Sequence, residues 1–144
     1  LGSGWGTGQL IKRYEVFSIE DNANFLNIYD SKYIHAPIIE GKNDLFPDDK
    51  GWYDVEVLKR EIPKNYDLIL VDGPWGEIGR GGFIKNLDLF RRDVPIIIDD
   101  IQRKEELELV KAVEERRDVK KKIYKSPRLK TEPKANEFAV LDPR

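Results

Sequence analysis

Two short segments near the N-terminus contain the residue types that bind a nucleoside. The turn Leu1–Gly8 has glycine at every second position from Gly2, and glycine lets the backbone approach a ligand where a Cβ would collide. A helix beginning near Thr7 would point its free N–H groups at the same place. Eighteen residues after Gly2, an apolar stretch ends in Glu20, and an acid at a strand end accepts hydrogen bonds from both hydroxyls of a ribose. The spacing predicts a site for a nucleoside-containing cofactor; the alternative is a glycine-rich tail beside an exposed acid.

Acidic residues also end two later apolar stretches. Asp72 follows Tyr66–Val71, and Asp99 and Asp100 follow Val94–Ile98. Open α/β sheets bind ligands at the carboxyl ends of their strands. Three carboxylates gathered there repel one another unless a cation lies between them, and oxygen ligands suit Mg²⁺. We expect either a metal site of these three carboxylates or, without a metal, Asp100 capping the next helix and Asp72 contacting only cofactor or backbone.

Composition limits the class of protein. The chain has 144 residues, 36% of them charged, a net charge of -2 and no cysteine, which predicts one globular domain over residues 1–144 without disulfides or thiolate metal sites. No apolar run reaches the ~18 residues of a membrane span, and no signal peptide is present, which favours a cytoplasmic protein. The chain has no Met and only Leu1 precedes the glycine turn. We therefore expect an incomplete N-terminus and a truncated first strand.

Apolar stretches alternate with amphipathic ones, which is typical of an α/β fold. Continuous apolar runs predict parallel strands that are buried on both faces. The predicted strands cover residues 15–20, 33–39, 66–72, 94–99, 119–124 and 137–141. The predicted helices cover residues 8–14, 22–29, 52–62, 83–91 and 103–117. The last two strands are close enough in sequence to pair antiparallel.

This order of motifs resembles the Rossmann-like S-adenosylmethionine-dependent methyltransferases, and the resemblance covers nearly the whole chain. It rests on the glycine turn, Glu20, the strand and turn Asp67–Gly76, the strand ending Asp99–Asp100 and the closing hairpin. The phrases Val-Asp-Gly-Pro at 71–74 and Ile-Asp-Asp at 98–100 are most similar to those of small-molecule O-methyltransferases. The family fold implied is a three-layer αβα sandwich around a mostly parallel seven-stranded sheet, with an antiparallel strand in the C-terminal hairpin.

The resemblance implies S-adenosylmethionine as methyl donor and a small hydroxylated molecule as acceptor. If no metal binds, Asp72 is the first candidate for the general base. Trp75, Arg80 and the nearby glycines of the flexible segment Gly79–Gly82 are expected to form a mobile rim above the site. The residues expected to bind the cofactor are Gly2, Ser3, Gly4, Trp5, Gly6, Glu20, Asp21, Asp72 and Gly73. In metal-dependent relatives an acid and an acid–amide pair bind Mg²⁺, which matches Asp72, Asp99 and Asp100 except that the last is not an amide.

Two other functions stay open. Basic residues cluster at 116–130, which would suit a methyltransferase acting on nucleic acid or protein, but they are balanced by acids and lack interleaved aromatic residues, which argues against nucleic acid. A non-catalytic domain that keeps the fold for binding is the other alternative, because His35 is the only histidine and packs or faces solvent. The sequence does not specify the oligomeric state.

Overall fold

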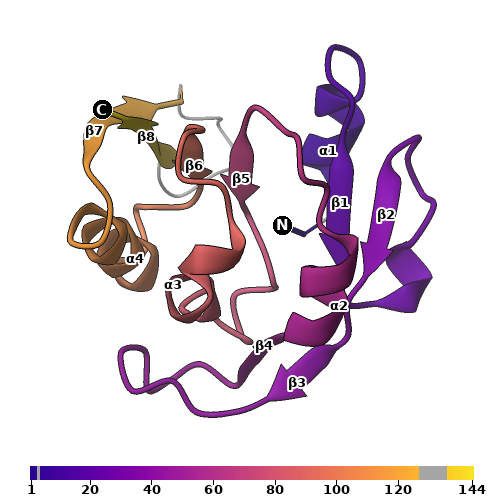
Figure 1. The fold of residues 1–144 in the computed structure, drawn as a ribbon, viewed down its shortest axis with the longest axis horizontal. Coiled ribbons are helices and arrows are strands. Elements are labelled where there is room, and N and C mark those ends of the chain that lie inside the picture. Colours follow the sequence, from indigo (N-terminus) through magenta and orange to yellow (C-terminus); the bar gives the residue numbers. More distant parts are fainter. Residues whose placement is uncertain (3, 127–135) are drawn as a thin grey trace.

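The computed structural model describes residues 1–2, 4–126 and 136–144 (Figure 1). Within these residues the chain forms short helices and three small sheets. The helices are α1 (Trp5–Leu10), α2 (Val55–Glu61), α3 (Gly82–Lys85) and α4 (Lys104–Glu114), with 3-10 turns at Ala23–Phe25 and Leu87–Leu89. The strands are β1 (Phe17–Glu20), β2 (Lys32–His35), β3 (Ile38–Glu40), β4 (Gly51–Tyr53), β5 (Ile69–Val71), β6 (Ile96–Ile98), β7 (Val119–Lys125) and β8 (Glu137–Pro143).

The expected seven-stranded, mostly parallel sheet of a Rossmann-like sandwich is wrong. The strands form a parallel pair β1–β2, an antiparallel pair β3–β4 and a four-stranded sheet in the order β5-β6-β8-β7. Between β1 and β5 lie Leu1 and Gly2 (Figure 1). The Leu1 nitrogen donates to the Leu70 carbonyl (2.8 Å), and the Gly2 N–H donates to the Ile19 carbonyl (2.8 Å). Two residues are too few to form a strand, so β1 and β5 stay in separate sheets.

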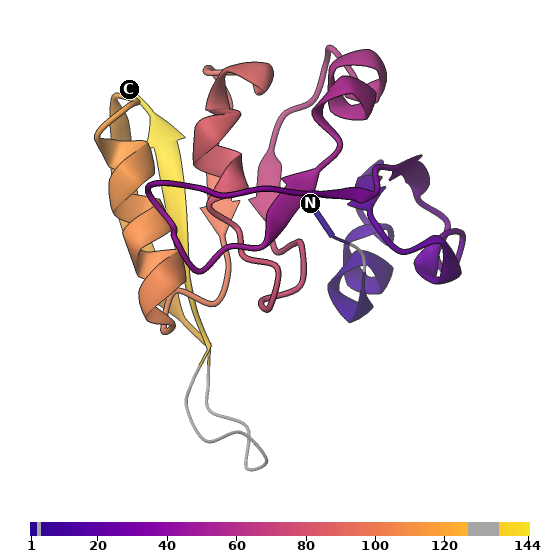
Figure 2. The ribbon, with the colours of Figure 1, turned by 90° about the horizontal axis from the view of Figure 1, so that it is seen from below.

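The four-stranded sheet contains the centre of the core. β5 and β6 pair in parallel with Ile69 opposite Ile96, and branched side chains of this kind pack well on a sheet. β8 lies between β6 and β7 and runs antiparallel to both, so the predicted closing hairpin is confirmed. Figure 2 shows α3 and α4 beside this sheet. The buried face of α4 contains Leu109, Val110 and Val113.

Several predicted helices are shorter than expected. Residues 22–29 form only the turn Ala23–Phe25, and Phe25 and Ile28 are half exposed because no surface covers them. The helix expected over 52–62 begins at Val55, since residues 51–53 pair with β3 instead. Asp54 caps it by accepting hydrogen bonds from two backbone N–H groups. No helix in the described ranges is both long and apolar enough to cross a membrane.

Candidate functional site

The two glycine turns predicted to bind a cofactor meet in space. A Cβ on Gly73 would lie 2.7 Å from the Gly2 Cα and 2.7 Å from the Tyr53 hydroxyl oxygen. Gly2 also has a φ of +84°, a region that glycine adopts without strain. Both positions therefore require glycine. The predicted proximity of these two segments is present in the structure.

The other predicted residues of the first turn lie more openly. An added Cβ would meet no atom within 4 Å at Gly4 or at Gly6. Helix α1 begins at Trp5, earlier than expected, and the Trp5 side chain is not described. Ser3 lies outside the described residues.

Glu20 ends β1 as predicted. Its side chain is buried, and its Oε1 accepts a hydrogen bond from the Asn22 N–H (3.0 Å). Burial raises the pKa of the neighbouring Asp21 carboxyl, and the negative charge of Glu20 raises it further. The Asn22 side chain accepts from the Asn24 N–H, so Asn22 caps the 3-10 turn Ala23–Phe25. His35 is exposed.

Tyr53 is the site residue that sequence reasoning missed. It is 1% exposed, and its hydroxyl has no hydrogen-bond partner in the part of the chain that the structure describes. Burial raises the pKa of Tyr53 well above its usual value, and the charges of Asp21, Glu20 and Asp72 add to this while Arg80 opposes it. The sequence had assigned Tyr53 to the start of a helix. Its placement depends on the pairing of β3 with β4, for which the sequence holds no local signal.

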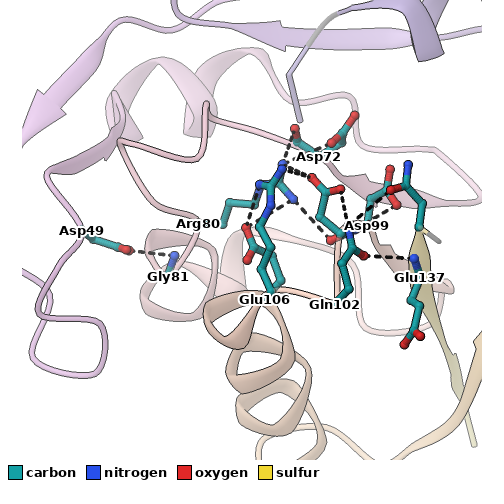
Figure 3. A network of polar contacts seen from close by, with 11 residues as sticks. Asp49, Asp72, Arg80, Gly81, Asp99, Gln102, Glu106 and Glu137 are labelled. Atoms are coloured by element: carbon teal, nitrogen blue, oxygen red, sulfur yellow. Dashed lines mark hydrogen bonds and ion pairs between the residues drawn. The ribbon is translucent and has the colours of Figure 1, made fainter. Parts of the chain in front are cut away.

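The three predicted metal-binding aspartates gather around a buried arginine instead (Figure 3). Arg80 Nη2 lies 3.2 Å from Asp72 Oδ1 and 3.3 Å from Asp100 Oδ2. Arg80 Nη1 donates to the Asp99 carbonyl (3.3 Å). Its distance to Glu106 Oε1 is 3.7 Å. The Arg80 side chain is 6% exposed, so this arginine is a fixed internal cation.

The three aspartates would repel one another without a cation between them, and the Arg80 guanidinium supplies that positive charge. Within residues 1–2, 4–126 and 136–144, no group of three His, Cys, Asp or Glu side chains is arranged to hold a metal ion. Arg103 adds a second cation, 3.0 Å from Asp100 Oδ2. Asp100 does not cap α4, whose N-cap is Arg103; it has a φ of 61°, which Asp tolerates better than most residues.

Asp72 is the one carboxylate of this group that solvent and ligands reach easily. Its side chain is 47% exposed, against 16% for Asp100 and 6% for Glu106. Partial burial raises the pKa of Asp72, Arg80 lowers it, and Asp99 and Asp100 raise it. A carboxylate with a raised pKa is a stronger base than an ordinary aspartate.

The segment Gly79–Gly82, expected to be a mobile rim, is packed tightly. The Gly81 N–H donates to Asp49 Oδ2 (2.8 Å). A Cβ on Gly82 would overlap the side chain of Trp52. Of the two side chains expected in the rim, Trp75 is 72% exposed, whereas Arg80 is buried. The glycines here allow close packing that holds Arg80 in place.

A cavity of about 340 Å³ lies between β1 and β5. Its lining includes Gly2, Gly4, Gly6, Thr7 and Asp72, together with apolar side chains of both strands. Glu20 and Gly73 lie outside this lining. The cavity therefore borders both the glycine turn and Asp72, the predicted base.

Comparison of the chain with known protein families, with curated proteins and with solved structures finds no match. The function is therefore inferred from the site alone.

Proposed function

We propose that this chain binds S-adenosylmethionine where Gly2 meets Gly73 and transfers its methyl group to a hydroxyl of a small molecule. One observation carries the proposal: the backbones of Gly2 and Gly73 touch beside the Tyr53 hydroxyl, which is buried and has no hydrogen-bond partner among the described residues. The charges of the strand-end acids Glu20 and Asp72 both act on this hydroxyl and raise its pKa. A buried polar group without a partner costs about 1–3 kcal/mol. A ligand acceptor atom at this position would remove that cost.

The residues present fit such a cofactor. Glu20, at the end of β1, would accept hydrogen bonds from the ribose hydroxyls. Gly2 lines the cavity and places no side chain in it, and the Tyr53 hydroxyl, beside Gly73, would donate to one of the ligand's acceptors. Asp21 borders the same place. When bound, the sulfonium group of the cofactor supplies an electrophilic methyl group.

Asp72 would act as general base in the transfer. A carboxylate oxygen of Asp72 would accept the proton of the acceptor hydroxyl during the transfer. Arg80 holds that carboxylate through Nη2 (3.2 Å) and lowers its pKa, which burial raises. Positioning of this kind supplies much of the acceleration in group transfer.

Calorimetric titration with S-adenosylmethionine tests the proposal, with NAD as the ligand control. We expect saturable binding of S-adenosylmethionine and no binding of NAD. Glu20→Gln should weaken it strongly, because hydrogen bonds to a charged acceptor contribute about 1.5–3 kcal/mol each. Glu77→Gln is the matched control, since Glu77 is exposed. A folded sample that gives no heat with S-adenosylmethionine would sink the proposal.

Two further experiments test the metal prediction and the non-catalytic alternative. Titration with and without Mg²⁺ tests the metal prediction for Asp72, Asp99 and Asp100, which identical isotherms would contradict. Binding without methyl transfer to any of a panel of hydroxylated acceptors would favour the non-catalytic alternative.

A nucleic-acid substrate gains no support from the basic hairpin. Lys121 lies 2.7 Å from Glu114, Lys122 lies 3.7 Å from Asp142, and Lys125 lies 2.8 Å from Glu137. These cations are paired with acids of the protein. Arg128 and Lys130 lie outside the described residues.

A further inference from the structure

A second cavity, of about 550 Å³, shares no lining residue with the candidate site. It lies between the β3–β4 loop, α3 with the turn after it, and the residues following α4. In Figures 1 and 2 that loop reaches past α3 toward α4. The basic residues in its lining are Lys42, Lys85, Arg92, Arg116 and Arg117.

The charge of this cavity is opposite to that of the chain. Five basic side chains face only two acidic ones, Asp44 and Asp88, whereas the whole chain has a net charge of -2. Arg92 is paired with Asp88 (2.6 Å). In the described part of the chain, neither Lys42 nor Lys85 has an ion-pair partner. The cavity therefore holds an excess of positive charge.

Arg117 fixes part of this charge inside the protein. Its guanidinium donates to the carbonyls of Arg91 (2.8 Å), Leu87 (2.7 Å) and Phe90 (2.9 Å), and the residue is buried. Backbone carbonyls, and no carboxylate of the described residues, accept the hydrogen bonds of Nη1 and Nη2, and only the more distant Asp88 opposes its charge. Burial lowers the pKa of Arg117, and the like charge of Arg92 lowers it further. An anion bound nearby would therefore stabilise the charged guanidinium.

Asn43 adds an unmet hydrogen-bond donor. This buried residue lines the cavity, and its Oδ1 accepts from the Leu45 N–H (3.1 Å). Its Nδ2 is buried without a hydrogen-bond partner. Buried polar groups are nearly always paired, so this amide calls for an acceptor that the described chain does not provide.

We propose that this cavity binds a small polyanion bearing phosphate groups, separately from the methyl donor. Guanidinium and ammonium groups are the usual partners of phosphate oxygens. Lys42 and Lys85 contact the ligand with exposed, mobile ammonium groups, Arg117 supplies fixed positive potential, and Asn43 donates to an oxygen. Ile84 and Leu87 give the cavity an apolar side for the carbon part of the ligand.

Titration of the ¹⁵N-labelled protein with inorganic pyrophosphate at constant ionic strength tests the proposal. We expect saturable shifts at the amides of Asn43, Leu45 and Lys85 and at the Asn43 side-chain NH₂. The double variant Lys42→Gln with Lys85→Gln should lose about tenfold or more in affinity. The double variant Lys64→Gln with Lys120→Gln makes the same charge change outside the cavity and should bind like the wild type.

Three results would overturn the proposal. One is the absence of saturable shifts below about 10 mM pyrophosphate. Another is an equal loss of affinity in the two double variants, which would mean that only overall charge matters. The third is tighter binding of citrate than of pyrophosphate, which would make the ligand a polycarboxylate.

Discussion

At the scale of single residues, the Tyr53 hydroxyl distinguishes a ligand-binding role from a packing role. Tyr53→Phe removes a buried donor that has no partner among the described residues, so the free energy of unfolding should stay the same or rise by up to about 1 kcal/mol. Affinity for S-adenosylmethionine should fall about 2- to 10-fold, the value of one ordinary hydrogen bond. Thermal unfolding and calorimetry of the same variant measure the two effects.

Tyr33→Phe is the control for Tyr53→Phe. Tyr33 lies outside the lining of the cavity, and its hydroxyl accepts a hydrogen bond from the Tyr29 N–H (3.3 Å), so its loss should destabilise the protein by about 1 kcal/mol without changing cofactor binding. If Tyr53→Phe instead lost stability and kept full affinity, the hydroxyl would have no role in the ligand site.

Arg80 is the residue whose removal should cost most. Arg80→Met leaves Asp72, Asp100 and Glu106 without their shared cation, and breaking a buried ion pair in this way costs about 3–5 kcal/mol. Without Arg80 the pKa of Asp72 rises further, because Arg80 now lowers it. The folded variant then binds more protons than the unfolded chain, so its stability should fall as pH rises.

Urea unfolding at pH 4.5 and pH 7 measures this effect. The deficit of Arg80→Met relative to wild type should be larger at pH 7, where the carboxylates are ionised. Arg92→Met removes an exposed pair with Asp88 and should cost under about 1 kcal/mol at either pH. An equal deficit of Arg80→Met at both pH values would mean that packing, not charge, explains it.

The sequence predicted that Asp72, Asp99 and Asp100 lie close together, but not that they surround the buried Arg80. Asp72, Asp99 and Asp100 follow apolar stretches that pair in parallel, so their proximity followed from strand pattern alone. Arg80 lies in a glycine-rich segment without periodicity, and only the packing of that segment on residues 46–52 turns its side chain inward. The positions of Arg80 and Tyr53 depend on contacts between distant segments, which single-sequence patterns do not encode.

At the scale of elements, the segment Gly79–Gly82 should tolerate no added side chain. A Cβ on Gly82 would overlap Trp52, whereas at Gly41 it would meet no atom within 4 Å. Gly82→Ala should therefore destabilise the protein by about 1–3 kcal/mol, and Gly41→Ala should be neutral or slightly stabilising. Comparison of the two melting curves measures the difference; equal curves would restore the view of this segment as a flexible rim.

The contact between Asp49 and the segment Gly79–Gly82 should make the stability of the protein depend on pH. Burial raises the pKa of Asp49 to about 6, against the hydrogen bond from Gly81. Between pH 4 and 6 the folded state then binds more protons than the unfolded state, so the contribution of Asp49 to stability falls as pH rises. Solvent screening limits this contribution to about 1 kcal/mol.

Asp49→Asn should flatten the stability profile between pH 4 and 6 and raise stability at pH 7. The raised pKa values of Asp21 and Asp72 act in the same direction, so part of the slope should remain. Asp30→Asn, at an exposed position, should leave the profile unchanged. A steeper slope in Asp49→Asn would contradict the assignment.

The positions of helices and strands were predicted better than the pairing and packing of these elements. The apolar strands β5 and β6, the helix α4 and the β7–β8 hairpin lie where periodicity placed them. The helix expected over 22–29 did not form because its apolar face meets no other surface. The strand predicted over 33–39 forms as two strands, β2 and β3, and β4 escaped prediction because its three residues were assigned to a loop and to the start of a helix.

At the scale of the whole molecule, the division into three sheets should give the chain unequal local stability. Two-stranded sheets are marginal in water, and β1–β2 is joined to β5 through Leu1 and Gly2. Strand β6 is paired on both sides and fully buried at Ile98. Amides of β1 and β2 should therefore exchange with solvent about tenfold faster or more than those of β6 and β8.

Ligands should change this exchange pattern at separate places. S-adenosylmethionine binds the folded ends of β1 and β5 in our proposal, so it should slow exchange in β1 and β2 most. Pyrophosphate should instead protect residues around Asn43 and leave β1 and β2 unchanged. Hydrogen-exchange mass spectrometry with each ligand alone resolves the two regions. Uniform protection of both by either ligand would show that the two sites are not independent, because binding at one would then be coupled to the folding of the whole chain.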